Sequence, residues 1–222
     1  LDKKWIEEIT RPFSGKKVDV VAGYYKGVAK NVFQECLIPY VLVMPDKVHP
    51  ESFLPATRSI AFTKAIWEKV GGFDERFSHN EDYVFANTLV RVRAKIVFAQ
   101  DAIVNWIPRN TVKSSFVMFY RFAIGDVEAG IFRDKVLLLF ARYLLFFYLL
   151  SLLVLYKSVL LGGGIALSLL GYLIWSAHKN YRYVRKAASI PIFIALQFIA
   201  DAAVLSGSLY GLFKRFFRCF RA

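Results

Sequence analysis

Hydrophobic residues are distributed differently in the two parts of the chain. Before residue 136 they occur in short runs with helical or strand-like spacing, separated by polar turns. Three long apolar segments follow, at residues 136–156, 158–177 and 188–213. Each has about the 20 residues that a helix needs to cross the hydrocarbon core of a bilayer. The pattern predicts a mixed soluble domain over residues 1–135 and a membrane region with a basic tail over residues 136–222.

The short runs of the first domain alternate between strand and helix patterns. β-Branched and aromatic residues predict strands at residues 18–25, 59–62, 95–98 and 102–106. Gln100-Asp101 is expected to form a turn between the last two. Helical spacing predicts helices at residues 2–10, 31–43, 64–70 and 111–132, and another that begins at residue 81. This alternation indicates an α/β layered structure.

Capping residues suggest where two of these helices begin and end. Thr63 can cap the helix at residues 64–70, and Gly71 can terminate it. Asn80 is expected to cap the next helix with its side chain, which places Glu81 and Asp82 in the first turn. The helix dipole favours negative charge at that end.

The net charge of +13 raises the question of a nucleic-acid partner. The basic residues gather at the ends of the apolar segments, where the positively charged flanks of membrane helices belong. We therefore expect membrane lipids, and no nucleic acid, as partners of these residues. They are Lys179, Arg182, Arg185, Lys186, Lys214, Arg215, Arg218 and Arg221.

The third apolar segment is compatible with two topologies. If the soluble domain is cytoplasmic, residues 178–186 lie inside, and a third span would place the basic tail outside, against the charge rule. Pro191, Gly207 and Gly211 would suit a re-entrant or interfacial segment. The length of the segment favours a span. We expect an integral membrane protein with a cytoplasmic domain, and we favour three spans over two.

An acidic residue interrupts the third apolar segment. Asp201 is costly in hydrocarbon unless it faces protein or water. It is expected to form a structural ion pair, either with Arg142 or with the basic loop that precedes the segment. Contact with a lipid-linked acceptor is the alternative.

Glu81-Asp82 is the best candidate for chemistry in the first domain. The pair follows a loop that begins with Gly71-Gly72. A carboxylate in this position can accept the proton of an attacking hydroxyl group. The alternative is a solvated helix start without a chemical role. The three histidines and two cysteines have no metal-ligand spacing, so no metal site is expected in this chain.

Four segments together resemble the second half of a family-2 glycosyltransferase. They are Arg58–Phe62, Trp67–Glu75, Glu81-Asp82 and Ile96–Val104. The family pattern has an "AF-[RK]" strand, a "VGGFDE" segment, an "ED" pair and an "I-V-F-x-x-D-A-x-V" hairpin. The resemblance covers roughly residues 1–135. It implies a partial GT-A-like, Rossmann-related α/β domain, followed here by transmembrane helices.

The resemblance also implies roles for the acidic pair and for a metal outside the chain. Asp82 would be the general base of an inverting displacement, with Glu81 supporting it. The family's Asp-x-Asp motif would hold Mg²⁺ or Mn²⁺ and the nucleotide-sugar donor, and it has no counterpart here. We expect the chain to be a fragment that lacks this motif and is inactive alone, with Leu1 marking either a truncation or the true start.

Five further residues are candidates for substrate binding. By resemblance, Arg58 could contact the acceptor, and Trp106 stands where many members carry a metal-reaching His. The alternatives are a strand-end charge for Arg58 and a core aromatic for Trp106. Arg109, Arg121 and Asp126 could line the acceptor or diphosphate side. The alternative for Arg121 and Asp126 is a helix that rests on lipid headgroups.

The combined expectation is a membrane-anchored inverting glycosyltransferase. It would move a sugar from a nucleotide-sugar donor to an acceptor hydroxyl of a lipid-linked glycan or cell-envelope polysaccharide. The alternative is a non-catalytic membrane scaffold or partner subunit with a transferase-like domain. A channel or transporter would not explain the pattern at residues 58–104.

Overall fold

The computed structural model describes residues 3–15, 17–77 and 79–219, except for the side chains of Arg218 and Cys219. It consists of two compact units, Leu1–Pro108 and Arg109–Ala222. The predicted helix at residues 111–132 belongs to the second unit, whereas the sequence pattern placed it in the domain over residues 1–135. Arg221, in the predicted basic tail, lies outside the described residues, as does Leu1.

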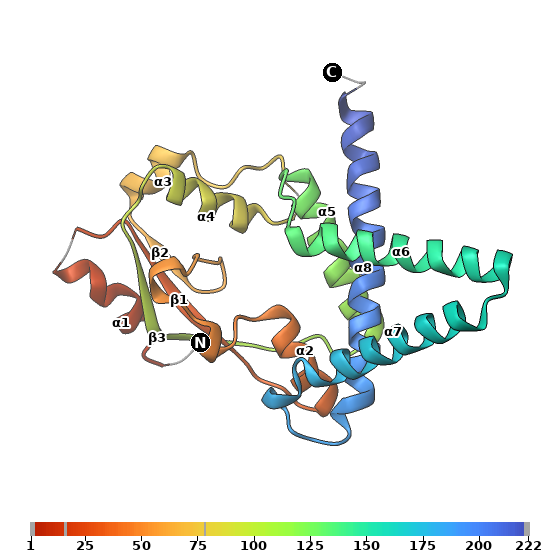
Figure 1. The fold of residues 1–222 in the computed structure, drawn as a ribbon. Coiled ribbons are helices and arrows are strands. Elements are labelled where there is room, and N and C mark those ends of the chain that lie inside the picture. The colour runs from red at the N-terminus through yellow and green to blue at the C-terminus, as the bar shows by residue number, and fades with distance from the viewer. Residues whose placement is uncertain (1–2, 16, 78, 220–222) are drawn as a thin grey trace. The chain divides into compact units, whose positions relative to one another are not determined.

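The first unit is built on a mixed sheet whose described strands have the order β2-β1-β3 (Figure 1). These are β1 (Val20–Gly27), β2 (Ile60–Phe62) and β3 (Ile96–Trp106). β2 pairs with β1 in the antiparallel direction and β3 pairs with it in the parallel direction. The helices are α1 (Trp5–Thr10), α2 (Val32–Val41), α3 (Lys64–Val70) and α4 (Glu81–Arg91). The expected α/β class is confirmed at this level.

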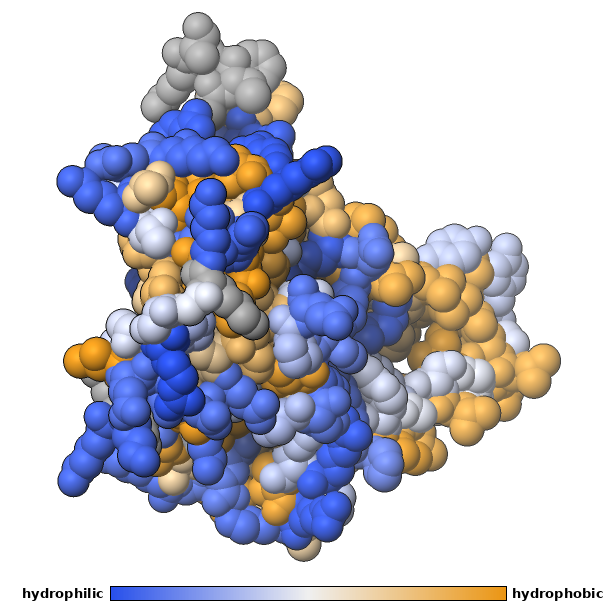
Figure 2. Space-filling view, turned by 90° about the vertical axis from the view of Figure 1, so that its left-hand side faces the viewer, coloured by the Kyte–Doolittle hydropathy of each residue, from blue (hydrophilic) through white to orange (hydrophobic). Residues whose placement is uncertain are grey.

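The two faces of β1 build two parts of the core. Val20 packs with Ile66 of α3 and with Phe85 and Leu89 of α4. Its neighbour Val21 packs with a separate cluster that includes Ile9 of α1. Successive strand residues point to opposite faces of a sheet, so this alternation places α3 and α4 on one face and α1 on the other. Hydrophilic side chains cover most of the face that Figure 2 turns to the viewer.

Residues 96–106 form one strand and not a hairpin. Both parts of this segment run parallel to β1, so the predicted turn at Gln100-Asp101 is wrong. The register shifts from Gly23↔Ala99 to Tyr24↔Ile103, which makes residues 100–102 a bulge in β3. The hydroxyl of Ser59 donates a hydrogen bond of 3.0 Å to the carbonyl oxygen of Ala102. This hydrogen bond satisfies the carbonyl oxygen of Ala102 within the bulge, and the chain continues in the same direction on both sides of it.

The predicted helix caps are partly confirmed. Thr63 Oγ1 accepts a hydrogen bond from the Ile66 amide at 3.3 Å, and Gly71 ends α3 with a φ of +78°. Asn80 occupies the N-cap position of α4, but its side chain makes no capping hydrogen bond, so that prediction is wrong. Asn80 has a φ of +60°, whereas capping side chains act from an extended backbone.

The second unit contains only helices and turns in its described part. They are α5 (Val112–Glu128), α6 (Asp134–Tyr156), α7 (Val159–His178), the 3₁₀ turn η4 (Tyr181–Tyr183) and α8 (Ser189–Cys219). Among the described helices, α6, α7 and α8 are long and apolar enough to cross a membrane. The three predicted apolar helices are confirmed as helices. Most side chains of α6 and α7 are exposed, whereas α8 packs against α5.

Asp201 of α8 is the centre of a polar cluster among α6, α7 and α8. Its carboxylate accepts hydrogen bonds from Arg142 Nη2 at 2.9 Å, from Gln197 Nε2 at 2.9 Å and from the hydroxyl of Tyr143 at 3.0 Å. The hydroxyl of Tyr172 donates to it as well. The predicted ion pair between Asp201 and Arg142 is confirmed. These contacts supply the partners that a buried carboxylate requires in apolar surroundings.

Gly23 is the position at which the sheet tolerates a side chain least. A Cβ atom there would overlap the Ser59 hydroxyl and lie 2.6 Å from the Ala102 carbonyl oxygen. We expect Gly23→Ala to lower the free energy of unfolding by about 1–3 kcal/mol, because the strands must separate. Pulse proteolysis of the detergent-solubilised chain in urea measures this change.

Gly15→Ala is the matched control. Gly15 has a φ of −142° and no atom within 4 Å of a Cβ. Its substitution should change the free energy of unfolding by less than about 0.5 kcal/mol. Equal effects of the two substitutions would contradict the close approach of β1, Ser59 and the β3 bulge.

Candidate functional site

Three polar or aromatic side chains meet at the carboxyl end of β1. Tyr25 lies near the end of β1, and Trp106 is the last residue of β3, where it pairs in register with Gly27. The guanidinium carbon of Arg58 lies 5.4 Å from the ring centre of Tyr25 and 5.8 Å from that of Trp106. Both distances fit cation–π contacts. In open α/β sheets, ligands bind at the carboxyl ends of the strands.

The position of Arg58 follows from the short strand β2. Because β2 is antiparallel to β1, the residues that precede it lie beside the carboxyl half of β1. Ser59 is buried and anchors this segment through its hydrogen bonds to Ala102 and from Trp5 Nε1, at 3.0 and 2.9 Å. Because Ser59 is anchored, the backbone of the adjacent Arg58 is fixed, and the Arg58 side chain lies against the two aromatic rings.

Asp82 lies at the same edge of the sheet. It is half-buried in the first turn of α4, and its Oδ2 atom is 3.5 Å from the Thr57 hydroxyl, at the outer limit of a hydrogen bond. Burial raises the pKa of Tyr25, the nearby Arg58 guanidinium lowers this pKa, and the Asp82 carboxylate raises it. Tyr25 thus lies within electrostatic reach of both charges.

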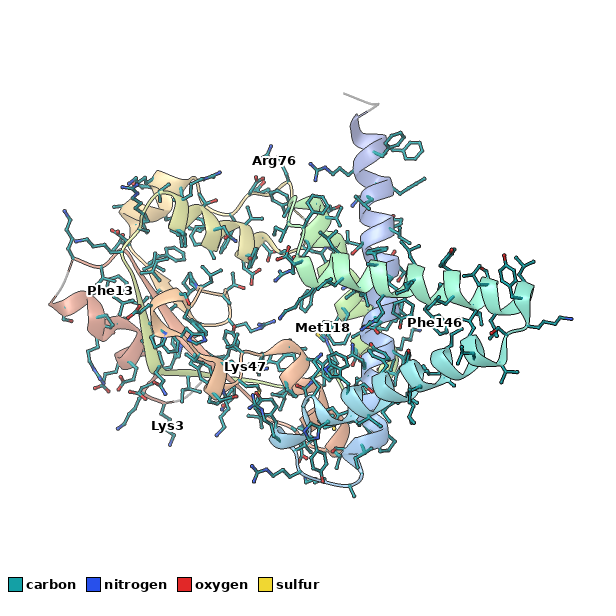
Figure 3. The ribbon with its side chains drawn as sticks, in the orientation of Figure 1. Lys3, Phe13, Lys47, Arg76, Met118 and Phe146 are labelled. Carbon is teal, nitrogen blue, oxygen red and sulfur yellow. The ribbon has the colours of Figure 1, made fainter. Side chains whose placement is uncertain are left out.

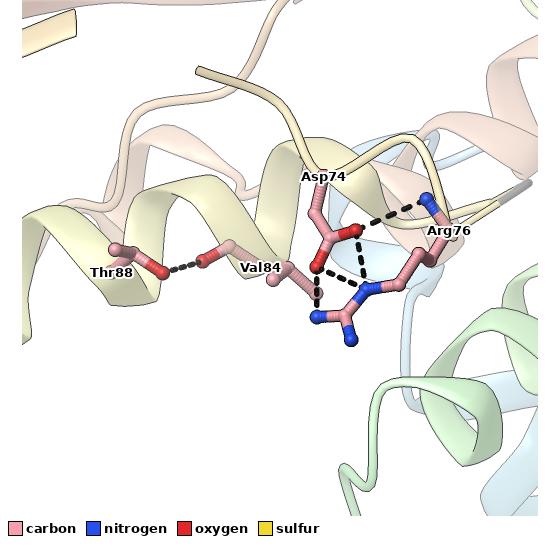
Figure 4. A network of polar contacts seen from close by, with 4 residues as sticks. All are labelled: Asp74, Arg76, Val84 and Thr88. Carbon is pink, nitrogen blue, oxygen red and sulfur yellow. Dashed lines mark hydrogen bonds and ion pairs between the residues drawn. The ribbon is translucent and has the colours of Figure 1, made fainter. Parts of the chain in front are cut away.

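The loop before α4 is held by an ion pair and a close ring contact. Arg76 donates to both carboxylate oxygens of Asp74, at distances from 2.7 to 3.1 Å (Figure 4). These hydrogen bonds lower the pKa of Asp74. Gly72 has a φ of +72°, and a Cβ atom there would lie 2.7 Å from the Trp67 ring. The glycine pair allows the loop to pass over Trp67 and lead into Glu81 and Asp82.

Four of the predicted site residues lie in the first unit, and three lie in the second. Arg58 contacts Tyr25 and Trp106, Asp82 is within electrostatic reach of Tyr25, and Glu81 is the half-buried neighbour of Asp82 in α4. The remaining candidates belong to the second unit, in which Arg109 and Arg121 are exposed. Asp126 forms an ion pair of 2.7 Å with Arg133.

Trp106 packs as the expected core aromatic, and its substrate-binding role stays a prediction. The ring lies at the edge of the cluster formed by Ala22, Tyr25, Leu42 and Phe53. It also lies within cation–π distance of the Arg58 guanidinium.

Sequence reasoning missed Tyr25, Thr57 and Ser59. Tyr24-Tyr25 at the end of a predicted strand was a usable signal, since aromatic residues at the carboxyl end of a strand can face a ligand. Thr57 and Ser59 flank Arg58 but carry no motif of their own. Their roles depend on distant partners, Asp82 and Ala102, which the local sequence does not identify.

The described residues do not fit a metal ion. Within residues 3–15, 17–77 and 79–219, no group of three or more His, Cys, Asp or Glu side chains could hold one. Asp82 and Thr57 alone offer too few oxygen ligands for Mg²⁺ or Mn²⁺. The chemistry that these residues support is proton transfer and the binding of polar or anionic groups.

The second unit contains an apolar cavity between α6 and α7. Its volume is about 810 Å³, and its lining is mainly apolar, with Leu145, Phe146, Leu161 and Phe198 among the lining residues. Figure 3 labels Phe146 on α6. Arg142 and Tyr172 of the Asp201 cluster also line it. This lining suits hydrocarbon chains better than water.

Comparison with known proteins adds no family assignment. No protein-family model matches the chain, and no curated protein matches its sequence. The functional interpretation therefore depends on the residues at the carboxyl end of β1 and on the family resemblance of the sequence.

The opposite effects of Arg58 and Asp82 on Tyr25 provide a test of this site. We expect Arg58→Gln to raise the pKa of Tyr25, because a positive charge that favours the phenolate is removed. Asp82→Asn should lower the same pKa, because a negative charge that opposes the phenolate is removed. The ¹³Cζ shift of labelled tyrosine, assigned with Tyr25→Phe, reports both changes between about pH 9 and 12.

Arg91→Gln is the control for this titration. Arg91 is at the opposite end of α4 from Asp82, about 14 Å away along the helix axis. Its removal should leave the pKa of Tyr25 unchanged. Shifts in the same direction for Arg58→Gln and Asp82→Asn would contradict the arrangement of the two charges around Tyr25.

Proposed function

We propose that the chain is the acceptor-side part of a membrane-anchored, inverting glycosyltransferase with a GT-A-like domain. The observation that supports this best is the contact of Arg58 with Tyr25 and Trp106 at the carboxyl edge of the sheet, with Asp82 beside Thr57 and within electrostatic reach of Tyr25. Arg58 and Asp82 come from different segments of the family-like pattern, and Trp106 follows a third. Residues of a shared site are expected to converge in this way, whereas unrelated surface charges are not.

Asp82 is the proposed general base. Its carboxylate takes the proton from the acceptor hydroxyl while that oxygen forms a bond to the anomeric carbon of the donor sugar. The bond from the anomeric carbon to the nucleoside diphosphate breaks on the opposite side, which inverts the configuration. A half-buried carboxylate in the first turn of α4 is open to the acceptor and fixed in direction by the helix.

Arg58 and Trp106 are proposed to position the acceptor. The guanidinium offers several donors in a planar fork, which suits sugar hydroxyls and phosphate oxygens. The ring of Trp106 offers an apolar face, against which the C–H face of a sugar can pack. Because Tyr25 and Trp106 hold the Arg58 side chain, little conformational entropy is lost when it binds.

A lipid-linked glycan is the proposed acceptor class. The second unit carries helices that are long and apolar enough to span a membrane, and an apolar cavity lies between two of them. A membrane anchor keeps the enzyme at the surface where lipid-linked substrates occur. Arg109, Arg121 and Asp126 remain predicted contacts for this acceptor or for the diphosphate.

Replacement of the base is the direct test of this function. In the full gene product, we expect Asp82→Asn to reduce kcat by about 10²–10⁴-fold, because proton acceptance is lost while the shape is retained. The assay follows transfer of labelled sugar from a panel of nucleotide sugars to membrane lipid extract. Circular dichroism confirms that the variant is folded.

Glu51→Gln is the matched control. Glu51 is an exposed carboxylate in the 3₁₀ turn Pro50–Ser52, outside the family-like segments, so its loss should leave transfer unchanged. Transfer at the unmodified rate by folded Asp82→Asn would refute the assigned role of Asp82. Absence of transfer by the unmodified gene product with every donor would favour the non-catalytic scaffold instead.

A further inference from the structure

α8 meets the α6–α7 pair at one place along its length. The hydrogen bonds from α6 and α7 to α8 reach Asp201, and Lys179 just beyond α7 bonds Gln197 at 3.2 Å. Ring contacts add Phe198, whose centre is 5.5 Å from that of Tyr172. Figure 1 shows α6 and α7 running out together from α8, which lies across them. Three parallel spans would instead share contacts along much of their length.

α8 packs lengthwise against α5. A Cβ atom on Gly207 would lie 2.5 Å from the Tyr120 carbonyl oxygen, and one on Gly211 would lie 3.0 Å from Val127 Cβ. Farther along the two helices, Lys214 Nζ forms an ion pair of 2.6 Å with the Glu128 carboxylate. Residue numbers rise together on both helices, so α5 and α8 run in the same direction. The packed segments of α5 and α8 must therefore lie at the same depth in any membrane.

α5 cannot lie in hydrocarbon. It has 17 residues, which is short for a span, and it is not among the described helices that could cross a membrane. It carries the exposed charges Lys113 and Arg121, together with Asp126 and Glu128. Charged side chains at the centre of a bilayer are costly. The part of α8 that follows α5, about residues 203–215, must therefore lie near the membrane surface.

The exposed face of α8 matches such a position. The spacing of three and four residues places Phe198, Asp201, Leu205, Leu209, Leu212 and Phe216 on one side of the helix. The first two contact α7 and α6, whereas Leu209, Leu212 and Phe216 are 56%, 43% and 58% exposed. The apolar stripe therefore faces the side from which α6 and α7 project. Gly207 and Gly211 face α5 on another side of the helix.

We propose that α8 is an interfacial helix that binds the lipid surface and does not span the membrane. The α6–α7 hairpin crosses the bilayer, α8 lies in the plane of the headgroups with Leu209, Leu212 and Phe216 in the acyl region, and α5 covers its other side. Exposed Arg215 and the basic residues of 179–186 lie at the same surface, where anionic headgroups attract them. With α8 at the surface, the basic tail stays on the inner side even though the segment is long enough to span, as the charge rule requires. The proposal does not depend on the proposed transferase activity.

A scan of depth along α8 tests this arrangement. Single nitroxides are placed at each position from 204 to 216 of the full chain except Gly207 and Gly211, where a side chain would displace α5, in vesicles of phosphatidylcholine and phosphatidylglycerol. Relaxation by oxygen relative to a nickel chelate should oscillate with a period of about 3.6 residues and peak at 205, 209, 212 and 216. A depth that changes steadily towards the bilayer centre along the helix would overturn the proposal.

The location of the C-terminus gives an independent test. A membrane-impermeant maleimide is applied from each side of sealed vesicles to Lys64→Cys, to Lys157→Cys and to a cysteine tag after residue 222. Lys64 is 87% exposed in the first unit, and Lys157 lies between α6 and α7. We expect the tag to react from the same side as Lys64→Cys and from the side opposite to Lys157→Cys. Labelling of the tag from the side of Lys157→Cys would mean a third span.

Two substitutions separate the stripe from general loss of the fold. Leu212→Lys should weaken binding of the stripe to lipid and abolish the oscillation around that position, while the Arg142–Asp201 contact maintains the hairpin. Asn110→Lys adds the same charge at an exposed position outside α8 and should leave the oscillation intact. Equal depth profiles for the two variants would contradict the assignment of the lipid-facing side.

Discussion

The hydroxyl group of Ser59 is the contact on which the first unit depends. It accepts a hydrogen bond from the indole of Trp5, donates one to the Ala102 carbonyl, and lies where a side chain on Gly23 would be. One buried atom thereby joins α1, all the described strands and the bulge in β3. Because a buried polar group is costly unless it is bonded, this arrangement tolerates little displacement.

The candidate site follows from that anchor. Arg58 is the residue next to Ser59, so the position of the serine determines where the guanidinium meets the rings of Tyr25 and Trp106. The register of β1 with β3 brings Trp106 to the same edge, and α4 presents Asp82 there. The charges and rings of the site are thus held by sheet geometry, which preorganises them for binding.

Ion pairs and hydrogen bonds satisfy the charged side chains at the helix contacts of the second unit. Asp201 is buried among α6, α7 and α8, where several donors bond its carboxylate. Glu128 pairs with Lys214, and Asp126 pairs with Arg133, near the C-terminal end of α5. Small residues on α8 permit the close packing that α5 requires.

The sequence by itself determined the helices and most strands, because their hydrophobic period and end residues act locally, as at Thr63 and Gly71. It also predicted Arg58, Asp82 and Trp106 as candidate site residues, and it named Arg142 as one of two possible partners of Asp201. It could not show that residues 96–106 form one strand, because the bulge depends on Ser59, 43 residues away from Ala102. Nor could it reveal that Tyr25 links the site residues, or that α8 lies across α6 and α7. Only the tertiary structure decided these points, since each depends on which distant segments approach one another, and local periodicity contains no information about that.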